Sequence, residues 1–397
     1  MEDQYVILTG SKNNAGDFLI KHRAKKLFSE LRSDRKIIDI DAWKQFSDEE
    51  LEIVNNSRAL ILMGGPALQF DMRPKVYELT QYLNDIKVPI ISMGIGWKSR
   101  EGEWRSSHTY KLNEPTLELL KRIDSSGYCS GVRDYHTLNI LLKNKFSNFL
   151  MTGCPALYNT DFIRKAFDTN IPIINISYSL GVSFVESDSM ETSMKENILG
   201  LSSFFKEKNF QVVFHHSLKK EVYQSSPEHD KFYKKHVEFQ AWLNDNQINY
   251  KDISGSAEGL IEHYQKCDLH IGYRVHAHIF MCSESRLSVL LNEDGRGKAL
   301  KYVISGLMFD AYELVKNELK LPNLNNKLYL KAINKIYLAL LPSVKYQIEM
   351  KGHPFLTEDI IQNLSYEIEN AFPRISATRK NIDLNYLQMK KFILQLP

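Results

Sequence analysis

Short apolar runs alternate with longer amphipathic segments along most of the chain, and this alternation restricts the possible folds more than any other feature. Residues 5–8 are apolar, a polar loop follows at residues 10–16, and apolar side chains then recur at helical spacing from residue 20 to residue 31. An apolar strand followed by an amphipathic helix is the unit of α/β proteins, whose sheets are mostly parallel. The sequence therefore predicts an α/β fold built from repeated βα units.

The predicted strands fall into two series, which are separated by a polar segment at residues 162–170 just before Pro172. We expect strands at residues 5–8, 36–40, 59–63, 89–93, 130–132 and 149–151, and then at 173–177, 211–214, 250–253, 267–271 and 288–291. After residue 307 the pattern becomes helical, with helices expected at residues 327–341 and 357–371. We therefore predict two Rossmann-like domains, at residues 1–168 and 169–310, and a helical C-terminal extension at residues 311–397.

Length and composition agree with this division and exclude several classes of protein. A chain of 397 residues exceeds one ordinary hydrophobic core, and 43% hydrophobic with 25% charged residues is typical of a soluble globular protein. A net charge of +3 is too small for a broad nucleic-acid surface. The four cysteines form no Cys-x-x-Cys pair, and the chain shows neither a signal peptide nor an apolar stretch of ~20 residues. We therefore expect a cytoplasmic protein with reduced thiols.

The segment Arg274-Val275-His276 follows the end of a predicted strand, where α/β proteins hold anions. The run from residue 275 to residue 282 is suited to a helix, whose N-terminal N–H groups favour negative charge. Arginine offers a planar fork for a carboxylate or phosphate, and histidine exchanges protons near neutral pH. Because one residue separates Arg274 from His276, an extended backbone would turn both side chains to the same face. The motif indicates an acidic, phosphorylated substrate that undergoes acid or base chemistry.

Glycine-containing motifs recur after other predicted strands, namely Asn14-Ala15-Gly16-Asp17, Met63-Gly64-Gly65-Pro66, Gly94-Ile95-Gly96, Gly131-Val132-Arg133-Asp134 and Gly153-Cys154-Pro155-Ala156. In this order, and together with the Arg-x-His element, they resemble the polysaccharide pyruvyltransferase family over residues 5–310. Members of that family move pyruvate from phosphoenolpyruvate onto sugar hydroxyls and are known for a GT-B-like fold, in which two Rossmann-like domains face a cleft. Cys154 stands where the family often has an aspartate, and Pro66 stands in place of a third glycine.

The resemblance implies roles for residues at the cleft. In the family, the arginine and histidine that match Arg274 and His276 contact phosphoenolpyruvate, so both are expected to be catalytic, with His276 as the general acid. Arg133 would hold the other anionic end of the donor, and Asp17 would accept the proton of a sugar hydroxyl. The remaining residues expected to bind substrate are Asn14, Gly16, Gly64, Gly65 and Gly94. Apart from the resemblance, His215 and His216 follow the predicted strand at residues 211–214 and are expected to face one cleft edge, where either would contact the acceptor or be only structural.

Each role also has a structural alternative. Arg274 would pair with a nearby acid, and His276 would make a hydrogen bond that only supports the fold. Arg133 would be a surface arginine paired with Asp134, and Asp17 would cap a helix. The glycines would only shape the turns beneath the cleft.

Other polar residues follow the later predicted strands. Glu293 and Asp294 would bind a sugar hydroxyl or a nucleotide, or else form a turn. His278 is expected to be buried on its helix, and with His276 it lacks the further ligands of a metal site, so we predict no metal.

The predicted reaction is pyruvyl transfer from phosphoenolpyruvate to a sugar of a surface polysaccharide or of its lipid-linked precursor, which forms a pyruvate ketal without a cofactor. Expected partners are the donor and a sugar or lipid-linked oligosaccharide. A lipid-linked acceptor would bring the protein into peripheral contact with the inner face of the membrane, and the extension allows a homo-oligomer. The alternative is a GT-B glycosyltransferase that uses a nucleotide sugar, because the same basic cleft would hold a diphosphate. A third class is a non-catalytic binding protein, for which Cys154 is the only indication.

Overall fold

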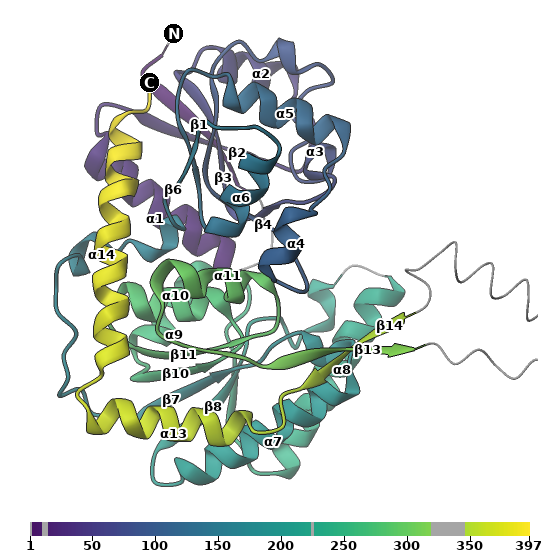
Figure 1. The fold of residues 1–397 in the computed structure, drawn as a ribbon, viewed down its shortest axis with the longest axis vertical. Helices are drawn as coiled ribbons and strands as arrows, with labels where there is room; N and C mark the ends of the chain where they lie inside the picture. Colours follow the sequence, from purple (N-terminus) through teal and green to yellow (C-terminus); the bar gives the residue numbers. More distant parts are fainter. Residues whose placement is uncertain (1, 10–14, 224–225, 319–345) are drawn as a thin grey trace, which may run out of the picture.

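The structure is a computed structural model, and it describes residues 2–9, 15–223, 226–318 and 346–397 (Figure 1). Its strands form two six-stranded parallel sheets and one two-stranded antiparallel sheet. We call the part that contains strands β1–β6 the first half, and the part that contains strands β7–β12 the second half. Figure 1 shows the first half above the second, with helices on both faces of each sheet.

The first half has the strand order β2-β1-β3-β4-β5-β6. Its strands are β1 (Gln4–Thr9), β2 (Lys36–Asp41), β3 (Ala59–Leu68), β4 (Ile90–Trp97), β5 (Ser130–Val132) and β6 (Phe149–Met151). Its helices are α1 (Ala15–Leu31), α2 (Asp48–Asn55), α3 (Met72–Lys75), α4 (Trp104–His108), α5 (Glu114–Asp124) and α6 (Tyr135–Lys143). The central strands β3 and β4 are buried along almost their whole length, which explains their continuous rather than alternating apolar residues.

The second half has the strand order β12-β11-β10-β7-β8-β9, which is the order of a Rossmann fold. Its strands are β7 (Asn175–Ser179), β8 (Asn209–Phe214), β9 (Tyr250–Asp252), β10 (Leu269–Gly272), β11 (Leu287–Asn292) and β12 (Leu307–Asp310). Its helices are α7 (Asp188–Phe204), α8 (Pro227–Asp245), α9 (Ala257–Gln265), α10 (Val275–Ser283) and α11 (Gly295–Ile304). Serine side chains cap the N-termini of α7, α8 and α9, which fixes where these helices begin.

The two halves are in direct contact through helices of both. Helix α1 of the first half packs against α9 and α10 of the second, and α6 packs against α11. A buried ion pair joins Arg23 on α1 to Glu284, which follows α10, with 2.9 Å between Nη2 and Oε1. Two Rossmann-like halves in this arrangement form a GT-B-like fold, so the predicted fold class is confirmed.

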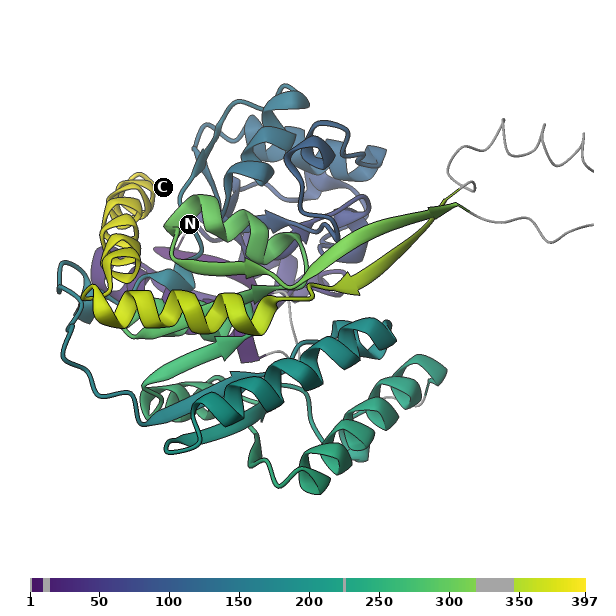
Figure 2. The same cartoon turned by 60° about the horizontal axis from the view of Figure 1, so that its bottom comes forward.

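The C-terminal extension contains more than the predicted helices. It begins with an antiparallel hairpin of β13 (Tyr312–Glu318) and β14 (Tyr346–Gly352), which projects from the body of the molecule (Figure 2). Helix α13 (Leu356–Glu369) confirms the helix predicted near residues 357–371, whereas the helix predicted at 327–341 lies outside the described residues. Helix α14 (Pro373–Leu394) was not predicted; it runs along both halves and packs against α1, α10 and α11 (Figure 1).

Candidate active site

The residues of the candidate site lie where the strand order of each sheet reverses. In the first half the reversal falls between β1 and β3; Gly16 and Asp17 belong to the first turn of α1 there, and Gly64 and Gly65 lie within β3. In the second half it falls between β7 and β10, and Arg274 follows β10. Open α/β sheets bind ligands outside the carboxyl ends of their strands at such points. Each half therefore places its candidate residues at a position where α/β sheets commonly bind ligands. Asn14 lies outside the described residues.

Arg274 is the residue that immediately precedes α10, and its guanidinium is held by neutral groups. Nε donates to the Leu180 carbonyl at 2.8 Å, Nη2 donates to the Gly181 carbonyl at 3.4 Å, and Nη1 donates to Nε2 of His216 at 3.2 Å. Burial lowers the pKa of Arg274, and the positive charge of Arg296 adds to this effect while Glu293 opposes it. Within the described residues no carboxylate lies within ion-pair distance of Arg274, so the alternative in which it pairs with an acid is wrong.

His276 sits between the two halves and is only 8% exposed. Its ring lies against the backbone of α1, because a Cβ built on Gly16 would overlap Nδ1 of His276. Nε2 is buried and has no hydrogen-bond partner among the described residues. Burial lowers the pKa of His276 to about 3, and the positive charges of Arg296 and Arg133 contribute to the shift. The imidazole is therefore neutral and ready to exchange a proton only when its surroundings change.

Arg274 and His276 do not share one face of an extended segment, as the sequence analysis assumed. Arg274 has extended dihedral angles, but α10 begins at Val275, so the two-residue alternation ends before His276. Arg274 reaches the loop after β7, whereas His276 reaches Gly16 in the first half. The two side chains thus approach the site from different sides.

Arg133 follows β5 and is buried, with 8% of its surface exposed. Nε lies 3.4 Å from Oδ2 of Asp134, and Nη2 donates to the Trp97 carbonyl at 3.4 Å. Its guanidinium covers Gly96, where a Cβ would overlap it. The predicted pairing with Asp134 is confirmed, but the surface position is wrong, and Arg133 remains close enough to His276 to lower its pKa.

Arg296, in the first turn of α11, is a site residue that the sequence analysis missed. It forms an ion pair with Asp294, whose negative charge raises the pKa of Arg296. Its charge also acts on His276, Arg274 and His216. The sequence places Arg296 between Gly295 and Gly297, shortly after a predicted strand. This position could have indicated a site residue, but the segment was interpreted only as a turn. Arg133, Arg274 and Arg296 are called the cation cluster below.

Glu293 and Asp294 both form hydrogen bonds with backbone groups near Arg274. Oε2 of Glu293 accepts hydrogen bonds from the backbone N–H groups of Val182 and Ser183, at 2.8 and 3.0 Å. Asp294 caps α11 and accepts from the N–H of Arg296 at 2.8 Å. These contacts hold the loop after β7 and the start of α11 in place beside Arg274.

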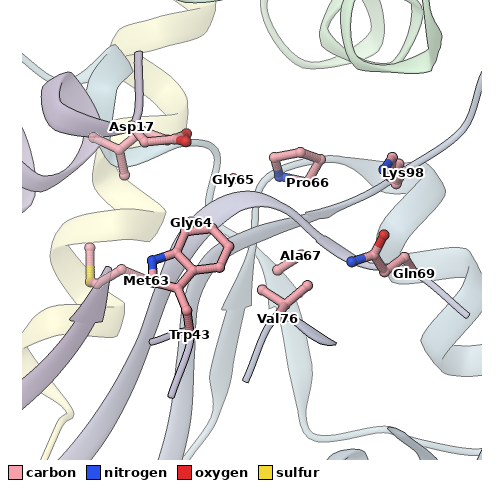
Figure 3. Close-up of a pocket in the computed structure, with 11 residues that line it drawn as sticks. Asp17, Trp43, Met63, Gly64, Gly65, Pro66, Ala67, Gln69, Val76 and Lys98 are labelled. Carbon is pink, nitrogen blue, oxygen red and sulfur yellow. The ribbon is translucent and has the colours of Figure 1, made fainter. Parts of the chain in front are cut away.

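A pocket of about 240 Å³ opens on the first half, beside Asp17 (Figure 3). Its lining consists of Asp17, Ile20, Trp43, Met63, Gly64, Gly65, Pro66, Ala67, Gln69, Val76 and Lys98. Gly65 has a φ of +85°, which favours glycine, and a Cβ there would lie 3.6 Å from Oδ1 of Asp17. Two predicted site glycines serve close packing: a Cβ on Gly64 would lie 2.9 Å from Ile20, and one on Gly94 would lie 2.6 Å from Pro155. Gly64 still lines the pocket, whereas Gly94 does not.

The neighbouring histidines His215 and His216 occupy different environments. His216 is partly buried and accepts the hydrogen bond from Arg274 described above. His215 is 8% exposed, and its Nε2 lies 2.7 Å from the hydroxyl of Tyr264. His215 therefore contacts Tyr264 whereas His216 contacts Arg274, and binding of substrate by either histidine stays a prediction. His278 is buried on α10, as predicted, with Nδ1 2.7 Å from Oγ of Ser288.

Cys154 lies beneath the cation cluster, in the wall of a small cavity that Arg133 and Arg296 also line. Burial raises the pKa of its thiol to about 11. The residue that stands in place of the usual aspartate is therefore a neutral thiol at physiological pH.

The described part of the chain offers no group of three or more His, Cys, Asp or Glu side chains arranged to hold a metal ion. Nor do its helices include one of the length and apolar character needed to span a bilayer.

Comparison with known proteins assigns the chain to a family. Residues 14–280 match the family described as "Polysaccharide pyruvyl transferase". The comparison with curated proteins found no match. Similar solved structures include the UDP-GlcNAc 2-epimerase of Methanocaldococcus jannaschii in complex with UDP-GlcNAc and UDP, with 11% identity, 91% of this chain and 99% of that chain covered, and a TM-score of 0.45. They also include the UDP-GlcNAc 2-epimerase of Neisseria meningitidis bound to UDP-GlcNAc, with 10% identity, coverage of 91% and 100%, and a TM-score of 0.44. A third is S. aureus TarM, with 14% identity, coverage of 86% and 56%, and a TM-score of 0.41. These structural likenesses are too distant to bear on the reaction.

Proposed function

The chain belongs to the polysaccharide pyruvyl transferase family, and on that premise we propose that it transfers the pyruvyl group of phosphoenolpyruvate to two hydroxyls of one sugar. The product is a pyruvate ketal on a surface polysaccharide or on its lipid-linked precursor. The observation that supports this reaction best is the cation cluster beside a buried, neutral His276. Arg274, which has no carboxylate partner among the described residues, supplies a charge that a bound anion would balance.

The donor has two anionic groups, a carboxylate and a phosphate, and we assign both to the cation cluster. Arg274 presents a planar guanidinium that can bind either group through two parallel hydrogen bonds. Arg133 belongs to the first half. The charge of Arg296 acts on both Arg274 and His276, so Arg296 adds to the positive charge around the donor. Binding would replace repulsion among cations by attraction to the donor.

We assign proton transfer to His276 and Asp17. His276 protonates the methylene carbon of the donor, which becomes a methyl group and leaves the adjacent carbon electrophilic. A sugar hydroxyl oxygen then bonds to that carbon and its proton passes to Asp17. The bond from carbon to the phosphate oxygen breaks with its electron pair, phosphate leaves, and a second hydroxyl closes the ketal while its proton departs with the phosphate. The products are one ketal and one inorganic phosphate for each donor molecule.

The low pKa of His276 is compatible with a role as general acid only when the donor is bound. In the empty site, burial and the charges of Arg296 and Arg133 keep the imidazole neutral. The negative charges of phosphoenolpyruvate would offset these cations and raise the pKa of His276. Proton loading would then be coupled to donor binding.

The test is acceptor-dependent release of phosphate from phosphoenolpyruvate, measured together with the mass of the acceptor. We expect phosphate release and a mass gain of one pyruvyl ketal. His276→Gln should lower turnover by about 10²–10⁴-fold, the usual contribution of a general acid, while donor binding is retained. His108→Gln is the control, because His108 is an exposed histidine on α4. Turnover of a nucleotide sugar without release of phosphate from phosphoenolpyruvate would overturn the proposal in favour of glycosyl transfer.

A further inference from the structure

The pocket beside Asp17 adjoins the cation cluster, yet none of the three arginines lines it. Its walls come from the segment after β2, which contributes Trp43, from β3 and the residue that follows it, and from Lys98 just after β4. Asp17 links the two regions, since it lines the pocket and its charge also acts on Arg296. A molecule bound in this pocket would therefore present one edge to the reacting centre.

The size and lining of the pocket fit a single sugar ring. Its volume of about 240 Å³ lies just below the ~300–1,000 Å³ of pockets that bind drug-sized ligands. Most of the lining is apolar, and the polar exceptions are few: Asp17, Gln69 and Lys98. A pyranose has the same division, with an apolar C–H face and hydroxyl groups around its edge. The pocket is thus suited to hold a sugar by one face and to orient it by its edge.

Trp43 is the aromatic residue of this pocket, and its indole is 37% exposed. The other tryptophans, Trp97, Trp104 and Trp242, each stack on or lie edge-on to another ring. Trp43 has no such contact with any ring among the described residues. An indole left partly exposed at a pocket offers its electron-rich face to the weakly positive C–H groups of a sugar.

Lys98 provides the positive charge of the pocket. It is exposed, and its ammonium group forms no ion pair with any residue that the structure describes. In the view of Figure 3, Asp17 and Lys98 lie on opposite sides of the pocket, and Trp43 lies below Asp17. A sugar that turns its reacting hydroxyls toward Asp17 would therefore place its far edge near Lys98.

We propose that this pocket is the acceptor subsite, in which Trp43 stacks on the acceptor sugar and Lys98 selects an acceptor with a negative charge on or next to that ring. The inference rests on the proposed function, because it identifies the sugar that receives the pyruvyl group. The negative charge belongs either to a carboxylate on the ring, as in a uronic acid, or to a phosphate at the anomeric position, as in a lipid-linked precursor. Both sources present the same chemistry to Lys98.

The test measures sugar binding without any donor, so that it does not depend on turnover. The probes are the methyl glycosides of glucose, galactose and mannose, the corresponding uronic acids, and the corresponding sugar 1-phosphates, each titrated by ligand-observed NMR. We expect an anionic probe to bind more tightly than its neutral counterpart. Preference for the uronic acid would identify a ring carboxylate, and preference for the 1-phosphate would identify the linkage phosphate. Absence of binding by every probe would overturn the inference.

Substitutions then separate the two contacts. Trp43→Ala should weaken binding of neutral and anionic probes alike by about tenfold, and Trp43→Phe should restore most of the loss because it keeps a ring face. Lys98→Met should weaken only the anionic probes, by about tenfold, and so abolish the preference. Lys121→Met is the matched control, because Lys121 is an exposed lysine on α5 that does not line the pocket. Unchanged binding in Trp43→Ala, or an equal loss for all probes in Lys98→Met, would refute the corresponding contact.

A parallel titration with phosphoenolpyruvate keeps this inference distinct from the proposed function. Both pocket variants should bind the donor as the unmodified protein does. If sugar binding depends on Trp43 but no pyruvyl transfer occurs, the proposed function fails and the subsite stands. If transfer occurs with the same Michaelis constant for the acceptor in Trp43→Ala, the subsite fails and the proposed function stands.

Discussion

At the scale of single residues, the candidate site has more positive than negative charge around Arg274, and a bound anion would balance the excess. Arg133 and Arg296 each have an acidic partner, Asp134 and Asp294, whereas Arg274 is held only by carbonyl groups and a neutral imidazole. Like charges held close together in a partly buried site repel each other strongly, because little water is present to screen them. His276 responds by remaining neutral. The binding of a dianionic or trianionic ligand should therefore change the protonation of this histidine.

We accordingly expect binding of phosphoenolpyruvate to be accompanied by uptake of a fraction of one proton near pH 6 by His276. The free site holds the pKa of His276 at about 3, so the imidazole is unprotonated at pH 6, and the donor's charges should raise the pKa. Calorimetric titrations in buffers of different ionisation enthalpy measure the uptake. His276→Gln should remove the part of the uptake that belongs to the imidazole, which leaves the contribution of the donor's own phosphate. Identical uptake in both proteins would show that His276 stays neutral in the complex.

The sequence predicted some site residues well and missed others for physical reasons. Arg274 and His276 follow a strand end, a position that can be located from the apolar run before it. Arg296 could not be distinguished from a turn residue, because its importance depends on the charge that it places near His276 in the folded protein rather than on its neighbours in the chain. The different contacts of His215 with Tyr264 and of His216 with Arg274 could not be predicted, since a pattern of residues does not reveal the partners of two adjacent side chains.

At the scale of secondary-structure elements, α14 connects the two halves. Its buried residues include Ile382, Met389 and Ile393, which belong to the hydrophobic core of the first half and the adjoining helices. Arg379 on the same helix donates to the Ser283 carbonyl at the end of α10, at 3.2 Å. The helix therefore fixes the position of α10, and with it the position of His276, relative to the first half.

We expect Ile382→Ala to lower the free energy of unfolding by about 2–5 kcal/mol, because it opens a cavity under a fully buried side chain at this junction. Leu384→Ala is the control from the same helix: Leu384 is 63% exposed, so its truncation should cost less than about 0.5 kcal/mol. Urea denaturation of both variants measures the difference. Equal stabilities would mean that the packing of α14 contributes little to the folded state.

The elements that were predicted are recognisable from a short stretch of sequence, whereas those that were missed depend on residues far apart in the chain or on burial. Strands β5 and β6 match the predicted residues; β6 is a compact apolar run, and β5 is a short segment of small residues that ends in Val132. Helix α14 was missed because Arg379 is buried at 3% exposure within its apolar stripe, which hides the helical period. The hairpin of β13 and β14 was missed because residues 319–345 separate its strands, so no turn signal joins them.

At the scale of the whole molecule, buried neutral histidines are concentrated in the second half. The histidines there with lowered pKa values are His215, His216, His236, His263, His270, His276 and His278, and burial is the main cause for each. Two of them bond to serine hydroxyls of the sheet: His263 on α9 to Ser177 of β7 at 2.9 Å, and His270 of β10 to Ser288 of β11 at 2.8 Å. Neutral imidazoles are thus part of the core of the second sheet.

These histidines should make the protein sensitive to mild acid. The pKa of His278 is about 3 in the folded protein and about 6.5 in the unfolded chain, so the unfolded state binds more protons between these values. Its contribution to stability is fully present above about pH 6.5 and is lost as the pH falls toward the folded value. For one such histidine the loss between pH 7 and pH 5 is about 2 kcal/mol.

We expect the free energy of unfolding to fall between pH 7 and pH 5, and His278→Gln to reduce that fall by about 2 kcal/mol. The comparison uses the difference between the two pH values, because the substitution also removes a hydrogen bond to Ser288 and destabilises the protein at every pH. Urea denaturation followed by circular dichroism gives both values. His108→Gln should leave the fall unchanged, since His108 is exposed to water before and after unfolding. The same fall in the unmodified protein and in His278→Gln would mean that this imidazole is protonated inside the folded core, and that acid sensitivity arises elsewhere.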